Sequence, residues 1–404
     1  MEARTLMTHD DIVILGGART PFGKFGGSLK DVTATELGVA AAKGALEASG
    51  VQPDHIDHVV FGNVIQSSRD AAYLGRHVAL WAGMPITVPG LTLNRLCGSG
   101  FEAVVQAARM IRCDEADIVM AGGSENMSQA PLVARTARWG VGLGEGLTLE
   151  DSLWQGLTDS YCNLPMAITA ENVAQKYSVT RMEQDELALA SQQRATAAWK
   201  EGRLAEEVVA VQGKDARGKP VNLVMDEHYR PDTTIEGLAK LPARFIPKDG
   251  TVTAGNASGI VDGAAALVVS SAKKAAELGL KPLARLVSWG IAGVEPALMG
   301  FGPAPAIRLA LQRAGLTVDD IGLFEINEAF AAQCLAVAKD LDLDLNTLNV
   351  NGGAIAIGHP LGATGARLVL TLIKEMKRRN VRYGSASMCI GGGMGSAGIF
   401  ELID

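Results

Sequence analysis

The sequence predicts an α/β fold built from two similar halves with an insertion between them. Short apolar runs alternate with segments of helical periodicity through most of the chain. Several segments of the second half repeat segments of the first half in one register. The chain also has 47 glycines against nine phenylalanines and five tryptophans, which favours tight turns and loop-built sites over a helical bundle.

The first half alternates strands and helices. Residues 12–15 are apolar and precede Gly16 and Gly17, which predicts a short strand that ends at this glycine pair. Residues 117–121 form a similar run before Gly122 and Gly123. The other expected elements are a helix at 35–48, a strand at 58–65, and helices at 71–82 and 101–111. This alternation favours a largely parallel, layered sheet.

The second half repeats the first at an offset of 265 residues (310 minus 45). The matched pairs are residues 45–51 with 310–316, Ile56 with Ile321, Asn94 with His359, and residues 96–100 with 361–365. One register held over several elements predicts a duplicated domain, so the two halves face each other and leave room for a site between them.

An insertion separates the halves. Residues 128–257 have no counterpart after the second half, and we predict three units: residues 1–127 with 258–278, the insertion 128–257, and residues 279–404. The insertion contains an expected helix at 181–201 and a polar run at 214–248. Its basic residues include Arg135, Arg138, Arg217, Lys219, Arg230, Arg244 and Lys248. The insertion is therefore either a solvated surface region or a lid over an anionic ligand.

Composition excludes several classes of protein. A net charge of −7 argues against nucleic acid as the main partner, because phosphate neutralisation requires a basic face. No stretch approaches the roughly 18 apolar residues of a membrane span. Residues 1–11 carry acidic side chains before any apolar run, so we expect no cleaved targeting segment and a cytoplasmic protein, with the mitochondrial matrix as the alternative.

The cysteine pattern predicts free thiols. The five cysteines are far apart and form no Cys-x-x-Cys pair, so we expect neither a disulfide framework nor a metal site. Cys97 precedes Gly98-Ser99-Gly100 and the helix at 101–111. A thiol at the positive end of a helix dipole is favoured as thiolate, and the small neighbours admit a substrate carbonyl, so Cys97 is a candidate nucleophile. The alternative is a buried cysteine that fills the core.

Three other stretches place reactive groups after apolar runs. They contain Asn327, His359 and Cys389, and Cys389 precedes the glycine run that starts at Gly391. If the two halves bring these groups to one pocket, Cys97 can attack a thioester and His359 can take its proton. Asn327 can place a water or donate to an oxyanion, and Cys389, at a pKa of about 8.5 or below, can move a proton.

These stretches resemble the thiolases, the acetyl-CoA acyltransferases, across essentially the whole chain. The resemblance rests on residues 94–100, 256–259, 327–330, 351–365 and 389–395. It implies a five-layered α-β-α-β-α thiolase fold, an inserted loop domain that binds coenzyme A, and ping-pong acyl exchange. It also implies a homotetramer assembled as a dimer of dimers, with no metal and no cofactor beyond coenzyme A.

The resemblance also assigns roles to residues. Cys97 matches the acylated nucleophile, His359 the base that activates it, and Cys389 the acid/base for the α-carbon proton. Asn327 matches the residue that holds a water for the enolate oxyanion, and the N–H groups of Cys97 and Gly391 the thioester oxyanion hole. The residues that resemble contacts to coenzyme A or its pantetheine arm are Arg230, Thr233, Ser258 and Met166. Cys113, Cys162 and Cys334 match no catalytic motif, and we expect them in the core.

One position bears on the substrate. Short-chain biosynthetic members often carry a His-Met pair where this chain has Pro165 and Met166, so the sequence resembles degradative 3-ketoacyl-CoA thiolases more closely. Loss of an imidazole favours a more apolar pocket that tolerates longer acyl chains.

Three rival functions are open to a sequence of this kind. A decarboxylating condensing enzyme such as a ketoacyl synthase shares the duplicated fold and the cysteine, but it usually needs two histidines. A non-catalytic acyl-CoA-binding protein is the second rival, and the retention of Cys97, Asn327, His359 and Cys389 argues against it. A nucleotide-dependent enzyme is the third, and the chain has no phosphate-binding Gly-x-x-x-x-Gly-Lys motif.

Overall fold

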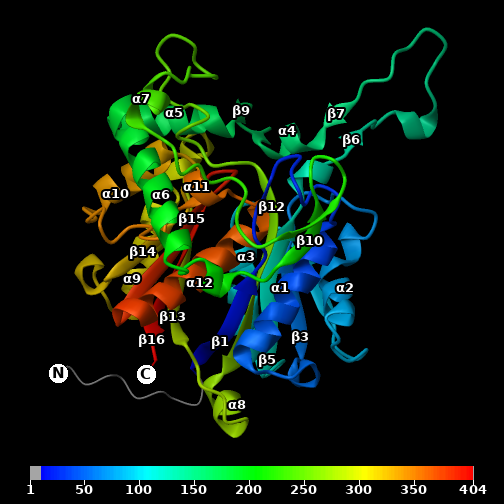
Figure 1. Cartoon of the computed structure of the whole chain (residues 1–404), viewed down its shortest axis with the longest axis vertical. Coiled ribbons are helices and arrows are strands. Elements are labelled where there is room, and N and C mark those ends of the chain that lie inside the picture. The colour runs from blue at the N-terminus through cyan, green and yellow to red at the C-terminus, as the bar shows by residue number, and fades with distance from the viewer. Residues whose placement is uncertain (1–10, 404) are drawn as a thin grey trace.

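The computed structural model describes residues 11–403. Residues 1–10, where we expect no cleaved targeting segment, lie outside the described residues. The described chain forms two α/β halves joined through one large mixed sheet, and most of the inserted segment lies across the top of both halves in Figure 1.

The sheet takes strands from both halves. The first half supplies β1 (Ile12–Arg19), β2 (Gly23–Lys24), β3 (His58–Gly62), β4 (Gly90–Leu93), β5 (Ile118–Glu125) and β12 (Val261–Ser271). The second half supplies β13 (Ala284–Gly293), β14 (Leu323–Ile326), β15 (Tyr383–Ile390) and β16 (Met394–Leu402). The order is β14-β15-β16-β13-β1-β12-β5-β3-β4, so the halves meet where β1 pairs with β13.

The prediction of a largely parallel sheet is wrong. Only β3 with β4, β3 with β5, and β14 with β15 pair in parallel, and the other neighbours are antiparallel. The turn from β15 to β16 gives one physical reason. Gly392 and Gly393 have φ values of 78° and 76°, a left-handed conformation that closes a hairpin and forces the two strands to run in opposite directions.

The predicted duplication is confirmed at the level of register. β5 and β15 are offset by the same 265 residues at both ends, 118 to 383 and 125 to 390. His58 stands opposite Val119 in the first half, and Leu323 stands opposite Gly384 in the second, again 265 residues further on. The repeated sequence therefore folds into the same strand pair twice.

The helices complete five layers. α1 (Ala34–Ser49) and α2 (Leu74–Trp81) cover the outer face of the first half, and α9 (Pro303–Ala314) and α10 (Ala331–Asp340) cover that of the second. α3 (Ser99–Arg112) and α12 (Leu361–Arg379) lie between the two parts of the sheet. The expected five-layered α-β-α-β-α architecture is thus confirmed.

The two central helices cross at glycines that the repeat places in equivalent positions. A Cβ added to Gly100 would meet the backbone nitrogen of Ala366 at 2.8 Å, and one added to Gly365 would meet that of Phe101 at 2.2 Å. Side chains are therefore excluded at the crossing, and the amino ends of α3 and α12 come close together.

Two glycine pairs lie inside strands rather than at their ends, contrary to prediction. β1 continues through Gly16 and Gly17 to Arg19, and β5 continues through Gly122 and Gly123 to Glu125. A Cβ on Gly123 would lie 1.9 Å from the carbonyl oxygen of Gly362 in α12. The glycines permit close packing here, so they do not terminate the strands.

The inserted segment forms small elements outside the large sheet. Its helices are α4 (Ser152–Gly156), α5 (Met166–Lys176), α6 (Arg181–Lys200) and α7 (Ile235–Ala239). Its two-stranded pairs are β6 (Leu132–Val133) with β7 (Glu150–Asp151), β8 (Thr158–Asp159) with β9 (Leu164–Pro165), and β10 (Val211–Lys214) with β11 (Pro220–Leu223). The expected helix at 181–201 is α6, which starts at a capping box formed by Thr180 and Glu183.

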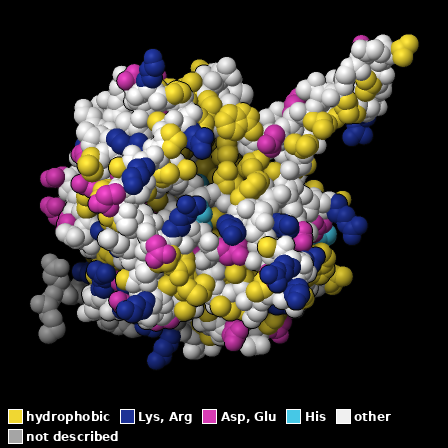
Figure 2. All heavy atoms as spheres, turned by 45° about the horizontal axis from the view of Figure 1, so that its top comes forward, with side chains coloured by type: hydrophobic (Ala, Val, Ile, Leu, Met, Phe, Trp, Pro, Cys, Tyr) yellow, Lys and Arg dark blue, Asp and Glu magenta, His cyan; other side chains and the backbone are white. Residues whose placement is uncertain are grey.

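Two shorter helices complete the described chain, α8 (Ala272–Glu277) and α11 (Ala354–Ile357). The segment between β6 and β7 projects as an arm, and Figure 2 shows apolar side chains along it. Trp139 on this arm is 87% exposed. Within residues 11–403, no helix is long and apolar enough to cross a bilayer.

Candidate active site

Cys97 lies in the loop between β4 and α3. Leu96 adopts a left-handed φ of 49°, and the Ser99 hydroxyl accepts from the Arg95 N–H and donates to the Leu96 carbonyl. A Cβ on Gly98 would lie 2.4 Å from the side chain of Ile390, the last residue of β15. The loop is therefore rigid and pressed against the second half, with Cys97 just before the first turn of α3.

The thiol of Cys97 is not a preformed thiolate. Burial among packed atoms raises the pKa of Cys97 to about 11, and the charge of Glu125 acts in the same direction. The backbone N–H groups of Gly391 and of Cys97 itself hydrogen-bond to the sulfur and lower the pKa, but by less. The expectation of a thiolate at Cys97 is therefore wrong for the free chain, because desolvation of the sulfur outweighs the two backbone hydrogen bonds to it.

Cys389 and Gly391 lie beside Cys97 at the end of β15. Cys389 is buried, and burial followed by the proximity of Cys97 raises the pKa of its thiol. The value is well above the expected 8.5 or lower, so Cys389 is protonated at neutral pH. Gly391 is buried and directs its N–H at the Cys97 sulfur. The hairpin that separates β15 from β16 thus brings an acid and a hydrogen-bond donor to the nucleophile.

His359 lies in the tight connection between α11 and α12. Its backbone N–H donates to the Gly259 carbonyl, and its ring Nδ1 lies 2.6 Å from Oγ1 of Thr364. The single proton of that hydroxyl goes to the Pro360 carbonyl, 2.9 Å away. Nδ1 of the ring therefore carries the proton and Nε2 is the unprotonated acceptor. Burial, assisted by the positive charge of Arg367, lowers the pKa of His359 to about 3, so the ring is neutral.

Asn327 follows β14 and is fully buried. Its Nδ2 lies 3.3 Å from Nε2 of His359, and its backbone N–H donates to Ser387. Its Oδ1 has no hydrogen-bond partner among the described residues. A buried carbonyl oxygen without a partner is costly, so this amide is suited to hold a water or a substrate group.

An apolar cavity of about 210 Å³ opens beside these groups. Met166 and Ser258 line it together with His359, and the sulfur of Met166 lies 3.7 Å from where a Cβ on Gly391 would stand. Sequence reasoning missed most of the remaining lining, which includes Trp154, Leu157, Phe245, Phe330 and Leu361. Phe330 and Leu361 lie in the stretches 327–330 and 351–365 that carry the resemblance, but no motif marks Trp154, Leu157 or Phe245 in the insertion.

Arg230 and Thr233 line a different cavity of about 550 Å³. The Thr233 hydroxyl donates to the Arg230 carbonyl, and the Arg230 N–H donates to Gln192 on α6. Ala254 and Gly255 form part of the same wall, whereas Ala257 and Ser258 border the apolar cavity. One segment, 254–258, therefore separates the two cavities and contributes to both.

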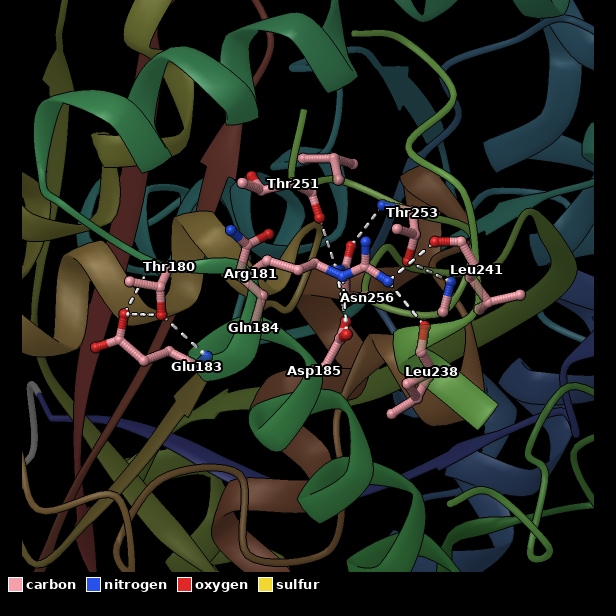
Figure 3. Close-up of polar contacts among 12 residues, drawn as sticks. Thr180, Arg181, Glu183, Gln184, Asp185, Leu238, Leu241, Thr251, Thr253 and Asn256 are labelled. Carbon is pink, nitrogen blue, oxygen red and sulfur yellow. Dashed lines mark hydrogen bonds and ion pairs between the residues drawn. The ribbon is translucent and has the colours of Figure 1, made fainter. Parts of the chain in front are cut away.

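A polar network fixes this segment (Figure 3). Nδ2 of Asn256 donates to Asp185 on α6 at 2.9 Å and to the Thr251 carbonyl, while its Oδ1 accepts from the Thr253 N–H. Arg181 binds the other oxygen of Asp185 and donates to the carbonyls of Leu238 and Leu241 at the end of α7. The wall of the larger cavity is thus tied to α6, which explains why these polar side chains are buried.

The prediction that three further cysteines lie in the core is only partly correct. Cys334 is buried as expected, but Cys162 is only half-buried and Cys113 is exposed, because it caps the solvent-facing end of α3. All five cysteines are free. In residues 11–403 no three His, Cys, Asp or Glu side chains are grouped so that they could hold a metal ion.

Comparison with known proteins identifies the family. The model "Thiolase, N-terminal domain" matches residues 12–273, and "Thiolase, C-terminal domain" matches residues 280–402. The chain is 51% identical to the mitochondrial 3-ketoacyl-CoA thiolase of Homo sapiens over 390 residues, 96% of this chain and 98% of the relative. It is 50% identical to the acetyl-CoA acetyltransferase of Cupriavidus necator over 387 residues, 96% of this chain and 98% of the relative.

Solved structures agree. The crystal structure of human mitochondrial 3-ketoacyl-CoA thiolase superposes with a TM-score of 0.95 at 50% identity and covers 98% of this chain and 100% of that one. The same human enzyme in complex with CoA gives a TM-score of 0.94 at 50% identity, over 97% and 98% of the two chains. Sequence, fold and the arrangement around Cys97 lead to one conclusion: the chain belongs to the thiolase family.

Proposed function

We propose that this thiolase exchanges acyl groups between coenzyme A and an acyl-Cys97 intermediate. The overall reaction is cleavage of a 3-ketoacyl-CoA by free CoA, or in reverse the condensation of two acetyl-CoA molecules. The observation that supports this most directly is the pair of adjacent thiols, Cys97 and Cys389, with the Gly391 N–H directed at the Cys97 sulfur. Relatives named for both directions of the reaction are about equally similar to the chain.

In the first half-reaction the Cys97 sulfur attacks the keto carbon and its proton moves to Nε2 of His359. The carbon–carbon bond then breaks, its electron pair stays on the acetyl-CoA carbon, and Cys389 gives that carbon a proton. The N–H groups of Cys97 and Gly391 stabilise the thioester oxyanion, and a water held by Asn327 stabilises the enolate oxygen. Because Cys97 and His359 are both neutral at rest, proton transfer must accompany attack.

In the second half-reaction the CoA thiol attacks the acyl-Cys97 thioester. Its proton passes to the Cys389 thiolate, and the departing Cys97 sulfur takes the proton from His359. The acyl-CoA leaves and both cysteines are thiols again. Sulfur, imidazole, amide and backbone N–H groups supply every step, so no metal or redox cofactor enters the reaction.

We infer that acyl chains longer than acetyl fit this site. Pro165 and Met166 border the cavity, and Pro165 stands where short-chain members often carry a polar imidazole. Trp154, Leu157 and Phe245 extend the apolar wall. An apolar pocket gains affinity with each methylene that it buries, about 0.8 kcal/mol. This supports 3-ketoacyl-CoA of intermediate length and the degradative direction of fatty acid β-oxidation.

The insertion, residues 128–257, is proposed to bind coenzyme A. The cavity lined by Arg230 and Thr233 has room for the nucleotide end, and Ser258 and Met166 flank the path of the pantetheine arm toward Cys97. Arg230 is solvent-exposed, so it can meet a phosphate at the rim. The crystal structure of the human relative with CoA supports this use of the fold.

We also propose a homotetramer built as a dimer of dimers. The arm carries exposed apolar side chains, Trp139 and Leu143 among them, and β4 leaves one edge of the large sheet uncovered within the described chain. Such surfaces are typical of subunit contacts. Five free cysteines favour a reducing compartment, and we propose the cytoplasm with the mitochondrial matrix as the alternative.

Steady-state kinetics test the proposed function. The rate of cleavage by free CoA is measured for acetoacetyl-CoA and for 3-ketoacyl-CoA of increasing length. We expect turnover of all, with kcat/KM rising beyond the four-carbon substrate. Activity confined to acetoacetyl-CoA would contradict the inference about chain length, and no thiolysis of any substrate would contradict the function.

A further inference from the structure

Glu125 is a buried carboxylate close to Cys97 that the mechanism above does not use. It is the last residue of β5 and is fully buried. Its Oε1 accepts from Nδ2 of Asn63 at 3.2 Å and from the Ile65 N–H at 2.9 Å. Its Oε2 accepts from the Val64 N–H at 3.1 Å and from the Gly362 N–H at 2.9 Å.

These four donors belong to two segments, one that contacts the Cys97 loop and one that follows His359. Asn63, Val64 and Ile65 follow β3, and this segment holds the Cys97 loop, because Asn94 donates to the Val64 carbonyl and the Asn63 N–H donates to Leu93. Gly362 is in the first turn of α12, three residues after His359. One carboxylate in the first half therefore connects the loop that carries the nucleophile to the helix that follows the base in the second half.

The hydrogen-bond pattern around Glu125 favours the ionised form. All four groups that face the two carboxylate oxygens are donors, so a proton on Glu125 would find no acceptor among them. The Asn63 amide cannot turn to provide one, because its Nδ2 also donates to the Ser124 carbonyl at 3.0 Å. A negative charge on Glu125 also lies at the amino end of α12, where the helix dipole stabilises it.

We propose that Glu125 is a positioning residue that aligns the Cys97 loop with the helix that follows His359, and that its negative charge adds to burial in holding the proton on Cys97 until substrate is attacked. The charge is close enough to the Cys97 sulfur to raise the pKa of that thiol. A thiol reacts more slowly than a thiolate with electrophiles other than the substrate. It also retains the proton that moves to His359 during attack. The inference rests on the role proposed for Cys97.

Other charged groups near the site do not replace Glu125. Burial, with a smaller contribution from the charge of Asp262 on β12, raises the pKa of Glu125 to about 7, so Glu125 carries its charge increasingly above that pH. From β15 Cys389 faces Cys97 as a neutral thiol, and from the second half His359 is a neutral ring. Arg95 in the Cys97 loop is paired with Glu102 of α3 at 2.8 Å.

The test compares Glu125→Gln with Glu171→Gln in the full-length protein. Glu171 is a matched control, because it is also buried and accepts the backbone N–H groups of Thr251 and Val252, but it does not act on the Cys97 pKa. The alkylation rate of Cys97 by iodoacetamide at pH 8 is measured by mass spectrometry of its peptide, alongside kcat. Alkylation requires no turnover, so its result is independent of whether Cys97 forms an acyl-enzyme.

We expect Glu125→Gln to raise the Cys97 alkylation rate about threefold, because a neutral side chain lowers the thiol pKa, and to reduce kcat about tenfold or more through misalignment. Glu171→Gln should leave the alkylation rate at the wild-type value. An unchanged or lower alkylation rate in Glu125→Gln, or an equal rise in Glu171→Gln, would overturn the proposal.

Glu125→Asp separates the effect of the negative charge from the effect of side-chain length. It is also the variant to measure if Glu125→Gln does not fold. The shorter carboxylate keeps the charge but cannot span Gly362 and residues 63–65 together. Its alkylation rate should stay near wild type while kcat falls about tenfold. Wild-type kcat in Glu125→Asp would show that alignment does not depend on this connection and would overturn the positioning role.

Discussion

The side-chain amide of Asn327 lies 3.3 Å from Nε2 of His359, with the opposite ring nitrogen held 2.6 Å from Thr364. The imidazole is therefore fixed at both nitrogens, one as donor and one as acceptor, before any substrate arrives. Its pKa of about 3 means that the ring enters the reaction as a neutral base and not as an imidazolium.

The buried neutral histidine predicts a pH dependence of stability. The His359 pKa is about 3 in the folded chain against an ordinary value of 6.5, so below pH 6.5 the unfolded chain binds a proton that the folded chain does not. The contribution is complete above pH 6.5 and is lost as pH falls toward 3. Wild-type unfolding free energy should fall by about 1 kcal/mol more than that of His359→Asn between pH 6.5 and 5.5, by urea titration. Equal losses would contradict the assignment of a neutral buried ring.

The roles of the two cysteines can be separated by Cys389→Ser. A serine hydroxyl is a far weaker acid and base than a thiol, so turnover should fall by at least about a hundredfold. Acylation of Cys97 by acetyl-CoA should become slower but remain detectable by mass spectrometry, because His359 still takes the Cys97 proton and CoA can leave as a thiolate without a proton from Cys389. Cys113→Ser, which changes an exposed thiol, serves as the control. Loss of acylation in a folded Cys389→Ser protein would reverse the two roles.

Arg230→Ala tests the proposed coenzyme A cavity. The contact is at an exposed rim, so its loss should cost about 1 kcal/mol and raise the KM for CoA several-fold with little change in kcat. The effect should shrink at high salt, since ions screen exposed charges. Arg217→Ala removes an exposed cation of the same insertion that does not line the cavity, and it should leave KM unchanged. A fall in kcat at constant KM would instead assign the insertion to shaping the catalytic pocket.

The crossing of α3 and α12 predicts an effect on stability. In Gly365→Ala the new Cβ would meet the Phe101 nitrogen at 2.2 Å, a contact that only backbone movement relieves, so we expect destabilisation of about 3 kcal/mol. Gly146→Ala is the control, because nothing lies within 4 Å of the added Cβ on the arm. Thermal unfolding of both variants gives the comparison. Equal melting temperatures would mean that the central helices do not pack as closely as described.

The sequence predicted the site better than the sheet. Cys97 was singled out because it precedes small residues and a helix, and His359 and Cys389 because they stand beside glycines after apolar runs. The repeat led us to expect that the two halves share one pocket. Strand direction was not readable because β1, β5 and β12 are buried on both faces, so these antiparallel strands show the continuous apolar runs that are typical of parallel sheets. Gly122 and Gly123 were misread as strand ends because the backbone atoms that approach them, those of Ala265 on β12 and of Gly362 on α12, come from far along the chain.

Other site features were missed for physical reasons. Glu125 reads as a polar residue after a strand, and its four donors come from two segments far apart in the sequence, residues 63–65 and Gly362. Thr364 could have been found, because it lies five residues after His359 where a helix begins and can return its hydroxyl to the ring. The raised pKa of Cys97 reflects packing by residues far away in sequence, which the local dipole argument omits.

The covalent intermediate on Cys97 is the central claim, and mass spectrometry of the intact protein tests it most directly. Wild-type protein incubated with acetyl-CoA should gain one acetyl group, and digestion should place it on the peptide that contains Cys97. Cys97→Ala should gain none and lose thiolysis by about four orders of magnitude or more. A Cys97→Ala protein that is still acetylated on another cysteine, or that still turns over substrate at the wild-type rate, would contradict the account.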